Sequence, residues 1–333
     1  MKQLGYVVLF LMLVIVLIPF ILIKGCSKSE PQPIPQKIEE KLGMIKVYID
    51  ESETVVEMDF NEYLKGVVAA EMPASFHIEA LKAQAIASRT YFLHRLINSR
   101  KNNITILEHH GADICTNAAH CKAWIGKDAA MEKWGLLSAQ QYWDKISKAV
   151  DETSNIIVTY QNEPIDAVFH STSSGRTENS EEVWSNVIPY LRSVISDGEE
   201  MSPKYISTVE VPASDFKNSL KNVSPQIVFK KDVKVWIEET EKTEGGMVRN
   251  IRIGGCNFRG TEIRSIFGLN SANFTIDIDN YQVVFNVKGN GHGVGMSQYG
   301  ANYLAGQEKA YEEILKHYYK DVEVVEMQDQ LIN

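Results

Sequence analysis

The sequence has little cysteine and no excess of positive charge. Four cysteines occur among 333 residues, and apart from Cys26 near the N-terminus there remain Cys115, Cys121 and Cys256. This odd number does not describe a disulfide framework. The net charge is −9, and no stripe of lysine and arginine is present. A nucleic-acid partner is therefore excluded, because binding phosphates requires clustered cations. A neutral sugar chain is compatible with this charge.

Two catalytic motifs are also missing. No HExxH pattern occurs, which counts against a zinc peptidase or amidase of that kind. The glycine-rich stretch Gly291–Gly295 lacks the Lys-Ser/Thr pair of a phosphate-binding loop. There is no internal repeat.

One long hydrophobic run begins the chain. Residues 4–23 are uncharged and mostly apolar, which is enough to cross a bilayer as a helix, and no small-x-small cleavage site follows. We predict a membrane anchor at residues 1–25, with a cleaved signal peptide as the alternative. Lys24 two positions before Cys26 disfavours a lipoprotein signal. Residues 26–43 carry three prolines and read as an extended linker.

The remaining pattern predicts an α+β fold for a body at residues 44–325, followed by a tail at 326–333. Mixed hairpins and helices occur without βαβ alternation. Asp59 three residues before Glu62 is typical of a helix start, and Pro73 should end that helix. Further predicted elements are a second helix at 78–97, a hairpin at 156–169, and a mostly β lobe at about 203–288.

Three segments together resemble the stage II sporulation protein D family. They read YLKGVVAAEMPASFHIEALKAQAIASRTY at 63–91, FHSTSSGRTENSEEVWSNVIPYLRSV at 169–194 and GNGHGVGMSQYGA at 289–301. The chain departs from the family pattern at Ser174, where a glycine is usual, and at 196–199, where Asp197 and Glu199 are both possible matches to a family aspartate.

The resemblance implies a lytic transglycosylase that cleaves peptidoglycan glycan strands during engulfment of the forespore. It also implies two partners, stage II sporulation proteins P and M. The body would lie outside the cell membrane, held by one span in the mother-cell membrane and facing the intermembrane space.

Glu71 is the predicted catalytic residue. It follows Val67, Val68 and two alanines at a predicted helix C-terminus. Apolar neighbours and the negative end of the helix dipole both favour the protonated acid, which glycosidic cleavage needs. The resemblance places the family's catalytic glutamate at this position. Taken alone, a glutamate at a helix end is usually just solvated.

A single glutamate can suffice for a lytic transglycosylase. Hydrolysing glycosidases normally use two carboxylates. Here the muramic acid's own C6 hydroxyl attacks C1, so one glutamate can protonate the leaving oxygen and then accept the hydroxyl proton.

Other polar residues are candidates for binding the substrate, each with a structural alternative. Lys82 and Arg89 share one helix face and could form a cationic wall or a solvated face. The remaining candidates could contact sugar, or could belong to local turns or the core: His170, Ser171, Ser173, Tyr190, His292, Ser297 and Gln298.

A cluster of histidine and cysteine predicts a structural zinc site. Its ligands would be His109, Cys115, His120 and Cys121, with His109 preferred to His110 by spacing. A Cys115–Cys121 disulfide is the alternative. Two other functions stay open: a zinc-dependent wall amidase, and a non-catalytic wall-binding scaffold.

Overall fold

The computed structural model describes residues 43–102, 104, 106–279 and 281–327. The predicted anchor, nearly all of the predicted linker, and the tail from residue 328 lie outside the described residues. Within the described part, no helix is both long and apolar enough to cross a membrane. The fold is mixed α+β, as predicted, with several small sheets.

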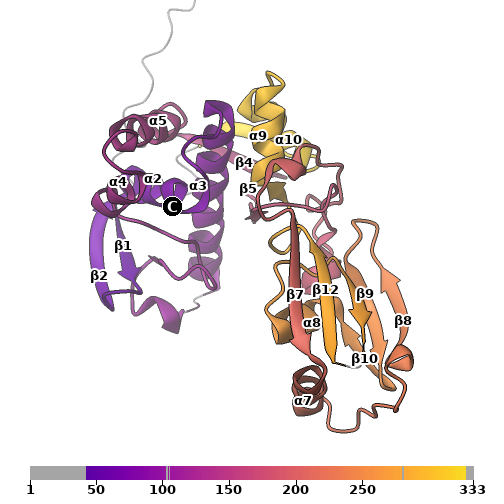
Figure 1. The fold of residues 1–333 in the computed structure, drawn as a ribbon. Helices are drawn as coiled ribbons and strands as arrows, with labels where there is room; N and C mark the ends of the chain where they lie inside the picture. Colours follow the sequence, from indigo (N-terminus) through magenta and orange to yellow (C-terminus); the bar gives the residue numbers. More distant parts are fainter. Residues whose placement is uncertain (1–42, 103, 105, 280, 328–333) are drawn as a thin grey trace, which may run out of the picture. The chain divides into compact units, whose positions relative to one another are not determined.

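The body is built around the long helix α3, which contacts α2, α5, α9 and α10 (Figure 1). Leu81, Ala85, Ser88 and Phe92 form one buried face of α3, and the helix is buried around most of its circumference. Small alanine side chains allow this close packing. The elements before the lobe begin with β1 (Met44–Ile49), β2 (Thr54–Asp59), α2 (Phe60–Glu71), α3 (Ile78–Lys101), η1 (Leu107–His109), β3 (Ile114–Cys115), α4 (Lys127–Trp134) and α5 (Ala139–Asp151).

The predicted hairpin at 156–169 is shorter in the structure. Gln161 and Asn162 both have positive φ, so a tight two-residue turn joins β4 to β5. β5 ends at Pro164, the Ile165 amide donates once more to the Val158 carbonyl of β4 at 3.2 Å, and Phe169 pairs with β13 instead. The elements of this part are β4 (Ile156–Tyr160), β5 (Glu163–Pro164), β6 (Phe169–His170), α6 (Ser180–Trp184), η2 (Glu199–Met201), and, near the C-terminus, β13 (Met296–Ser297), α9 (Gln298–Gly306), α10 (Tyr311–Tyr318) and β14 (Glu323–Glu326).

Residues 206–288 form the lobe, which has its own hydrophobic core. Its strands β7 and β12 run side by side and pair Ile206 with Lys288, so the chain leaves and re-enters the body at one place (Figure 1). Alternate residues of β12 are buried, as a one-sided sheet requires. The elements are β7 (Ile206–Pro212), α7 (Ala213–Val223), η3 (Val233–Val235), β8 (Ile237–Lys242), β9 (Val248–Ile253), β10 (Cys256–Arg259), α8 (Gly260–Phe267), β11 (Phe274–Ile278) and β12 (Gln282–Lys288).

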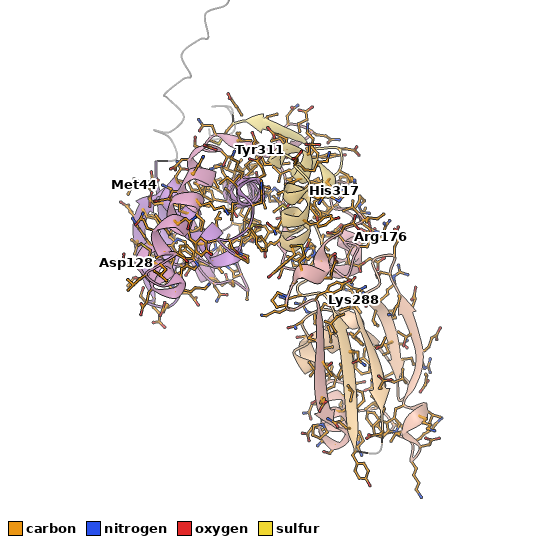
Figure 2. All side chains as sticks on the ribbon, turned by 45° about the horizontal axis from the view of Figure 1, so that its top comes forward. Met44, Asp128, Arg176, Lys288, Tyr311 and His317 are labelled. Carbon is orange, nitrogen blue, oxygen red and sulfur yellow. The ribbon has the colours of Figure 1, made fainter. Side chains whose placement is uncertain are left out.

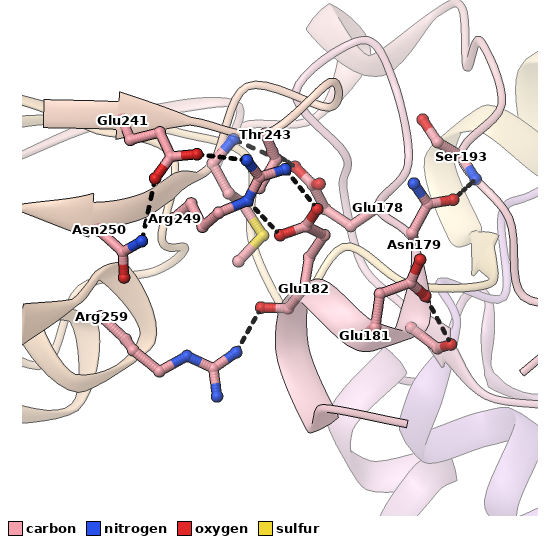
Figure 3. A network of polar contacts seen from close by, with 12 residues as sticks. Glu178, Asn179, Glu181, Glu182, Ser193, Glu241, Thr243, Arg249, Asn250 and Arg259 are labelled. Atoms are coloured by element: carbon pink, nitrogen blue, oxygen red, sulfur yellow. Dashed lines mark hydrogen bonds and ion pairs between the residues drawn. The ribbon is translucent and has the colours of Figure 1, made fainter. Parts of the chain in front are cut away.

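Polar contacts join α6 and its preceding residues to the lobe. Arg249 lies between Glu182 and Glu241, with N–O distances of 2.6 and 2.5 Å (Figure 3). The buried Glu178 carboxylate accepts hydrogen bonds from Thr243 Oγ1 at 3.0 Å and the Met247 amide at 3.1 Å. Arg176 and Lys288 lie in this same region (Figure 2).

Candidate active site

A cleft of about 420 Å³ lies at the C-terminal end of α2. Segments distant in the sequence contribute to it, and among its described lining residues Glu71 is the only acid. Aromatic and basic side chains accompany polar ones around it. The lining comprises residues 69–75, Lys133, Trp134, Tyr142, Ser171, Ser202, Pro203, Lys204, Asn290, Gln298 and Tyr299.

Local sequence brings Glu71 to the cleft. The Asp59 side chain caps α2 by accepting from the amides of Asn61 at 2.9 Å and Glu62 at 3.1 Å, as predicted. The helix ends at Glu71 because Met72, before Pro73, is extended. The carboxylate therefore leaves the last turn of α2 and enters the cleft.

Glu71 is held by hydrogen bonds while burial favours its neutral form. Its Oε1 accepts from the Ala123 amide at 2.9 Å. Burial raises the pKa of Glu71 above its usual value, although Lys122, the Ala123 amide and the Gln298 side chain act in the opposite direction. The net effect is a pKa above that of a free glutamate, which is the direction that a proton donor requires.

Lys122 is a partly buried cation beside this acid. Its Nζ lies 4.2 Å from the ring centroid of Tyr91 and 3.9 Å from that of Phe169. Both rings can stabilise an ammonium group that has left water. The following residue, Ala123, is the one that bonds Glu71.

Gly66 allows this loop to approach α2. A Cβ at this position would lie 2.2 Å from Trp124 Nε1, so any larger residue would displace the loop. The Ile125 amide also donates to the Gly66 carbonyl at 3.2 Å. Close backbone approach at Gly66 thus delivers the Ala123 amide to Glu71.

The predicted metal ligands meet at the start of the same loop. The ligand atoms of His109, Cys115, His120 and Cys121 all lie within 4.8 Å of one another. His109 Nε2 is 3.1 Å from Cys121 Sγ, and His120 Nδ1 is 3.2 Å from Cys115 Sγ. Tetrahedral zinc places such ligand atoms ~3.3–3.8 Å apart, given Zn–S and Zn–N bond lengths. The donor set suits zinc, and small movements of the side chains would bring the ligand atoms to this spacing.

Two further contacts concern the neighbouring histidine and the two cysteines of this cluster. His110 is not part of it, since its ring stacks on Tyr48 at a centroid distance of 4.2 Å. Cys115 and Cys121 are both free thiols in the structure, so the alternative disulfide is not formed there.

Comparison with known proteins identifies the family. A family model described as stage II sporulation protein matches residues 48–160. The chain is 37% identical to stage II sporulation protein D of Bacillus amyloliquefaciens over 289 residues, 87% of this chain and 80% of that protein. The protein of the same name from Bacillus subtilis (strain 168) is also 37% identical, over 85% of this chain and 79% of that protein. This chain belongs to the stage II sporulation protein D family.

The family is involved in sporulation, and a more distant relative is named as an enhancer of an amidase. This relative is the amidase enhancer of Bacillus subtilis (strain 168), 28% identical over 77% of this chain and 39% of its own length. The segment that matches the family model contains both Glu71 and the metal-ligand cluster.

Two of the predicted substrate-binding residues line the cleft of this family member, namely Ser171 and Gln298. The Gln298 side chain also lowers the pKa of Glu71, and its Nε2 donates to Gln84 Oε1 at 3.3 Å. The other predicted substrate ligands are not among the lining residues.

Lys82 and Arg89 do not form a cationic wall at the cleft. Lys82 pairs with Glu79 and Glu152, both at 3.0 Å. Arg89 is fully buried and donates to the carbonyls of Ile156 at 3.2 Å and Val150 at 3.4 Å. Burial lowers its pKa to about 9, which leaves it charged at neutral pH. Its contacts join α3 to the end of α5 and the start of β4.

His170 is buried and His292 is partly buried, and both bond backbone carbonyls rather than line the cleft. His170 Nδ1 bonds the Val294 carbonyl at 3.1 Å, and His292 Nε2 bonds the Phe169 carbonyl at 3.0 Å. Burial lowers the pKa of His170 to about 4. The two neutral rings fasten β6 to the glycine-rich segment. Tyr190 is also buried, and its hydroxyl accepts from the Asp166 amide at 2.9 Å.

Ser173 and Ser297 lie behind the cleft wall. Ser173 donates to Glu199, while Ser297 caps α9 by accepting from the Gly300 amide at 3.3 Å. Of the two acids in segment 196–199, Glu199 is buried and Asp197 is exposed. Glu199 is therefore the one that packs inside the body.

Sequence reasoning missed several cleft residues. Trp134 and Tyr142 line it with their rings 5.8 Å apart, from the end of α4 and from α5. Lys122, which acts on Glu71 electrostatically, stood directly beside a predicted metal ligand. Its place next to Cys121 in the sequence is the one feature that could have indicated this role of Lys122.

Proposed function

We propose that this protein is a lytic transglycosylase that cleaves the MurNAc–GlcNAc bond of peptidoglycan and leaves 1,6-anhydro-MurNAc ends, in septal wall remodelling and engulfment. The observation that carries this proposal is Glu71, a cleft carboxylic acid whose pKa burial raises. Family membership supports a role in sporulation. Trp134, Tyr142 and Tyr299 supply aromatic surface on which sugar rings can stack.

The chemistry requires only one proton-transferring group. Protonated Glu71 donates its proton to the glycosidic oxygen as the C1–O bond breaks. The resulting carboxylate accepts the proton of the C6 hydroxyl as that oxygen attacks C1 and closes the anhydro ring. The Ala123 amide at 2.9 Å and the Gln298 side chain stabilise the carboxylate between these two steps.

No second acid stands among the described lining residues, which suits an internal nucleophile better than hydrolysis. A hydrolase would need a carboxylate at about 5–9.5 Å from the first to attack the sugar or activate water. Buried Glu199 is not part of the lining.

We also propose a structural zinc held by His109, Cys115, His120 and Cys121. Four protein ligands leave no open position for a substrate, and His109, Cys115 and Cys121 are buried. The bound metal would stabilise the loop that presents Ala123 to Glu71. This closed set argues against a zinc-dependent amidase, which needs an exposed coordination position.

The cellular setting is a further part of the proposal. Residues 1–25 would anchor the protein in the mother-cell membrane with the body in the intermembrane space. The partners would be stage II sporulation proteins P and M together with the glycan strands. The apolar run at 4–23 and the family membership support this placement.

One product analysis tests the proposed activity. The full chain in detergent micelles is incubated with peptide-free glycan strands, and the products are identified by mass. Anhydro-muramic ends are expected. Reducing muramic ends would mean hydrolysis, free peptides from intact peptidoglycan would mean an amidase, and glycan binding without cleavage would mean a scaffold.

A further inference from the structure

Glu199 is a buried carboxylate behind the cleft wall. Glu199 is the first residue of η2, and it is 1% exposed. Three donors converge on it. Oε2 accepts from the Ser173 amide at 3.0 Å, and Oε1 accepts from Ser173 Oγ at 2.8 Å and Ser196 Oγ at 2.6 Å. Both oxygens are thus used as acceptors.

The first turn of α9 rests on this cluster. A Cβ at Gly300 would lie 2.1 Å from Tyr318 Oη, 2.3 Å from Ser196 Oγ and 3.0 Å from Glu199 Oε1. Ser196 Oγ also lies 2.7 Å from Tyr318 Oη on α10. Only glycine at position 300 allows α9 to approach so closely. Tyr318, Ser196 and Glu199 together therefore limit where this turn can lie.

Both segments that contact Glu199 continue directly into the cleft. The Ser171 carbonyl, two residues before Ser173, accepts from the Tyr299 amide at 3.1 Å. Ser171, Gln298 and Tyr299 line the cleft together with Glu71, whose pKa the Gln298 side chain lowers. A path of contacts thus runs from Glu199 through residues 171–173 and α9 to the catalytic acid.

We propose that Glu199 is a positioning residue, whose carboxylate fixes the 171–173 segment and the start of α9 against each other and thereby aims Gln298 and Tyr299 at the substrate beside Glu71. The kinetic part of this inference rests on the proposed transglycosylase activity. The structural part does not.

The donors around Glu199 favour a carboxylate over an amide. In Glu199→Gln the new NH₂ group would face either the Ser173 amide or the two serine hydroxyls. In Glu199→Asp the side chain is one methylene shorter and cannot keep all three contacts. The titratable groups nearby are Tyr318 on α10 and the exposed Asp197 on the same loop. Burial raises the pKa of Glu199, while the donor hydrogen bonds lower it.

The test compares Glu199→Gln and Glu199→Asp with Asp197→Asn, an exposed acid two residues away, as the matched control. Hydrogen–deuterium exchange of the full chain in micelles should show faster exchange in peptides covering 171–173 and 298–300 for both Glu199 variants. Exchange in β12 should not change. The control should match the wild type throughout.

Kinetics on peptide-free glycan strands separate positioning from general loss of structure. We expect kcat to fall about 10- to 100-fold with KM changed by less than about threefold, because small misplacements cost rate more than affinity.

The outcomes distinguish the positioning role of Glu199 from the proposed transglycosylase activity. Unchanged exchange at 298–300 in both Glu199 variants, or an equal loss of kcat in Asp197→Asn, would overturn the positioning role. Altered exchange in a protein whose wild type cleaves no glycan would remove the proposed activity and keep the structural link. If both Glu199 variants fail to fold, Ser196→Ala removes one donor only and should reproduce the exchange change in milder form.

Discussion

The backbone amide of Ala123 lies 2.9 Å from Oε1 of Glu71, although the two residues are far apart in the sequence. This contact joins the candidate metal loop to the candidate catalytic acid. It follows from the close approach of Trp124 to Gly66 on α2. The stability of the loop and the orientation of the acid are therefore coupled.

Glu71→Gln should fold and bind glycan but lose cleavage. Gln keeps the shape and can still accept from the Ala123 amide, yet it has no proton to transfer to the leaving oxygen. The expected loss is at least ~10²–10⁴-fold in the rate of anhydro-muramic product formation, measured by mass. The matched control is Glu62→Gln, an exposed acid on the same helix, which should retain full activity. Full activity in Glu71→Gln would remove this residue from the mechanism.

Cys115→Ser should lose the proposed zinc. The purified wild type is expected to contain about one zinc, since structural sites use four protein ligands. Metal analysis and thermal unfolding should show less metal and a lower Tm in the variant. Cys256→Ser, outside the cluster, should change neither. Wild-type protein without zinc and with a Cys115–Cys121 disulfide would contradict the site.

Arg89→Ala should reduce stability rather than substrate affinity. The substitution leaves a cavity and deprives the carbonyls of Ile156 and Val150 of their donor. We expect a loss of about 3 kcal/mol or more in the free energy of unfolding, measured in denaturant. Lys82→Ala, which removes partly exposed ion pairs, should cost about 1 kcal/mol or less. A large loss of glycan affinity in folded Arg89→Ala would contradict this structural role and mean that Arg89 acts in substrate binding.

Glu178→Gln should stabilise the protein more at pH 8 than at pH 5. Burial raises the pKa of Glu178 to about 7 in the folded state, from 4.5. Between these values the folded protein binds more protons than the unfolded chain, so stability falls as pH rises through this window. Gln removes the proton dependence and keeps an acceptor for Thr243 and Met247.

Thermal unfolding at the two pH values checks this prediction. Glu244→Gln, an exposed acid that pairs with Arg176, serves as the control and should show no such difference. An equal effect of Glu178→Gln at both pH values would mean that its carboxyl group is ionised throughout.

The sequence alone determined the family and indicated the catalytic candidate and the candidate metal ligands. Each depends on local information. Pro73 ends α2 next to Glu71, and the four metal ligands lie close together in the chain, so little folding is needed to bring them near each other. Helix and strand bounds signalled by caps and alternation, such as Asp59 and β12, were predictable for the same reason.

Only the tertiary structure decided which polar residues reach the cleft. His170, His292 and Arg89 have the same polarity as cleft ligands, but long-range packing buries them against backbone carbonyls. Glu199 and Lys122 gained their positions beside the cleft from contacts across 26 and 51 residues, to Ser173 and Glu71 respectively. Burial arises from the whole fold, and no local pattern of polarity specifies it.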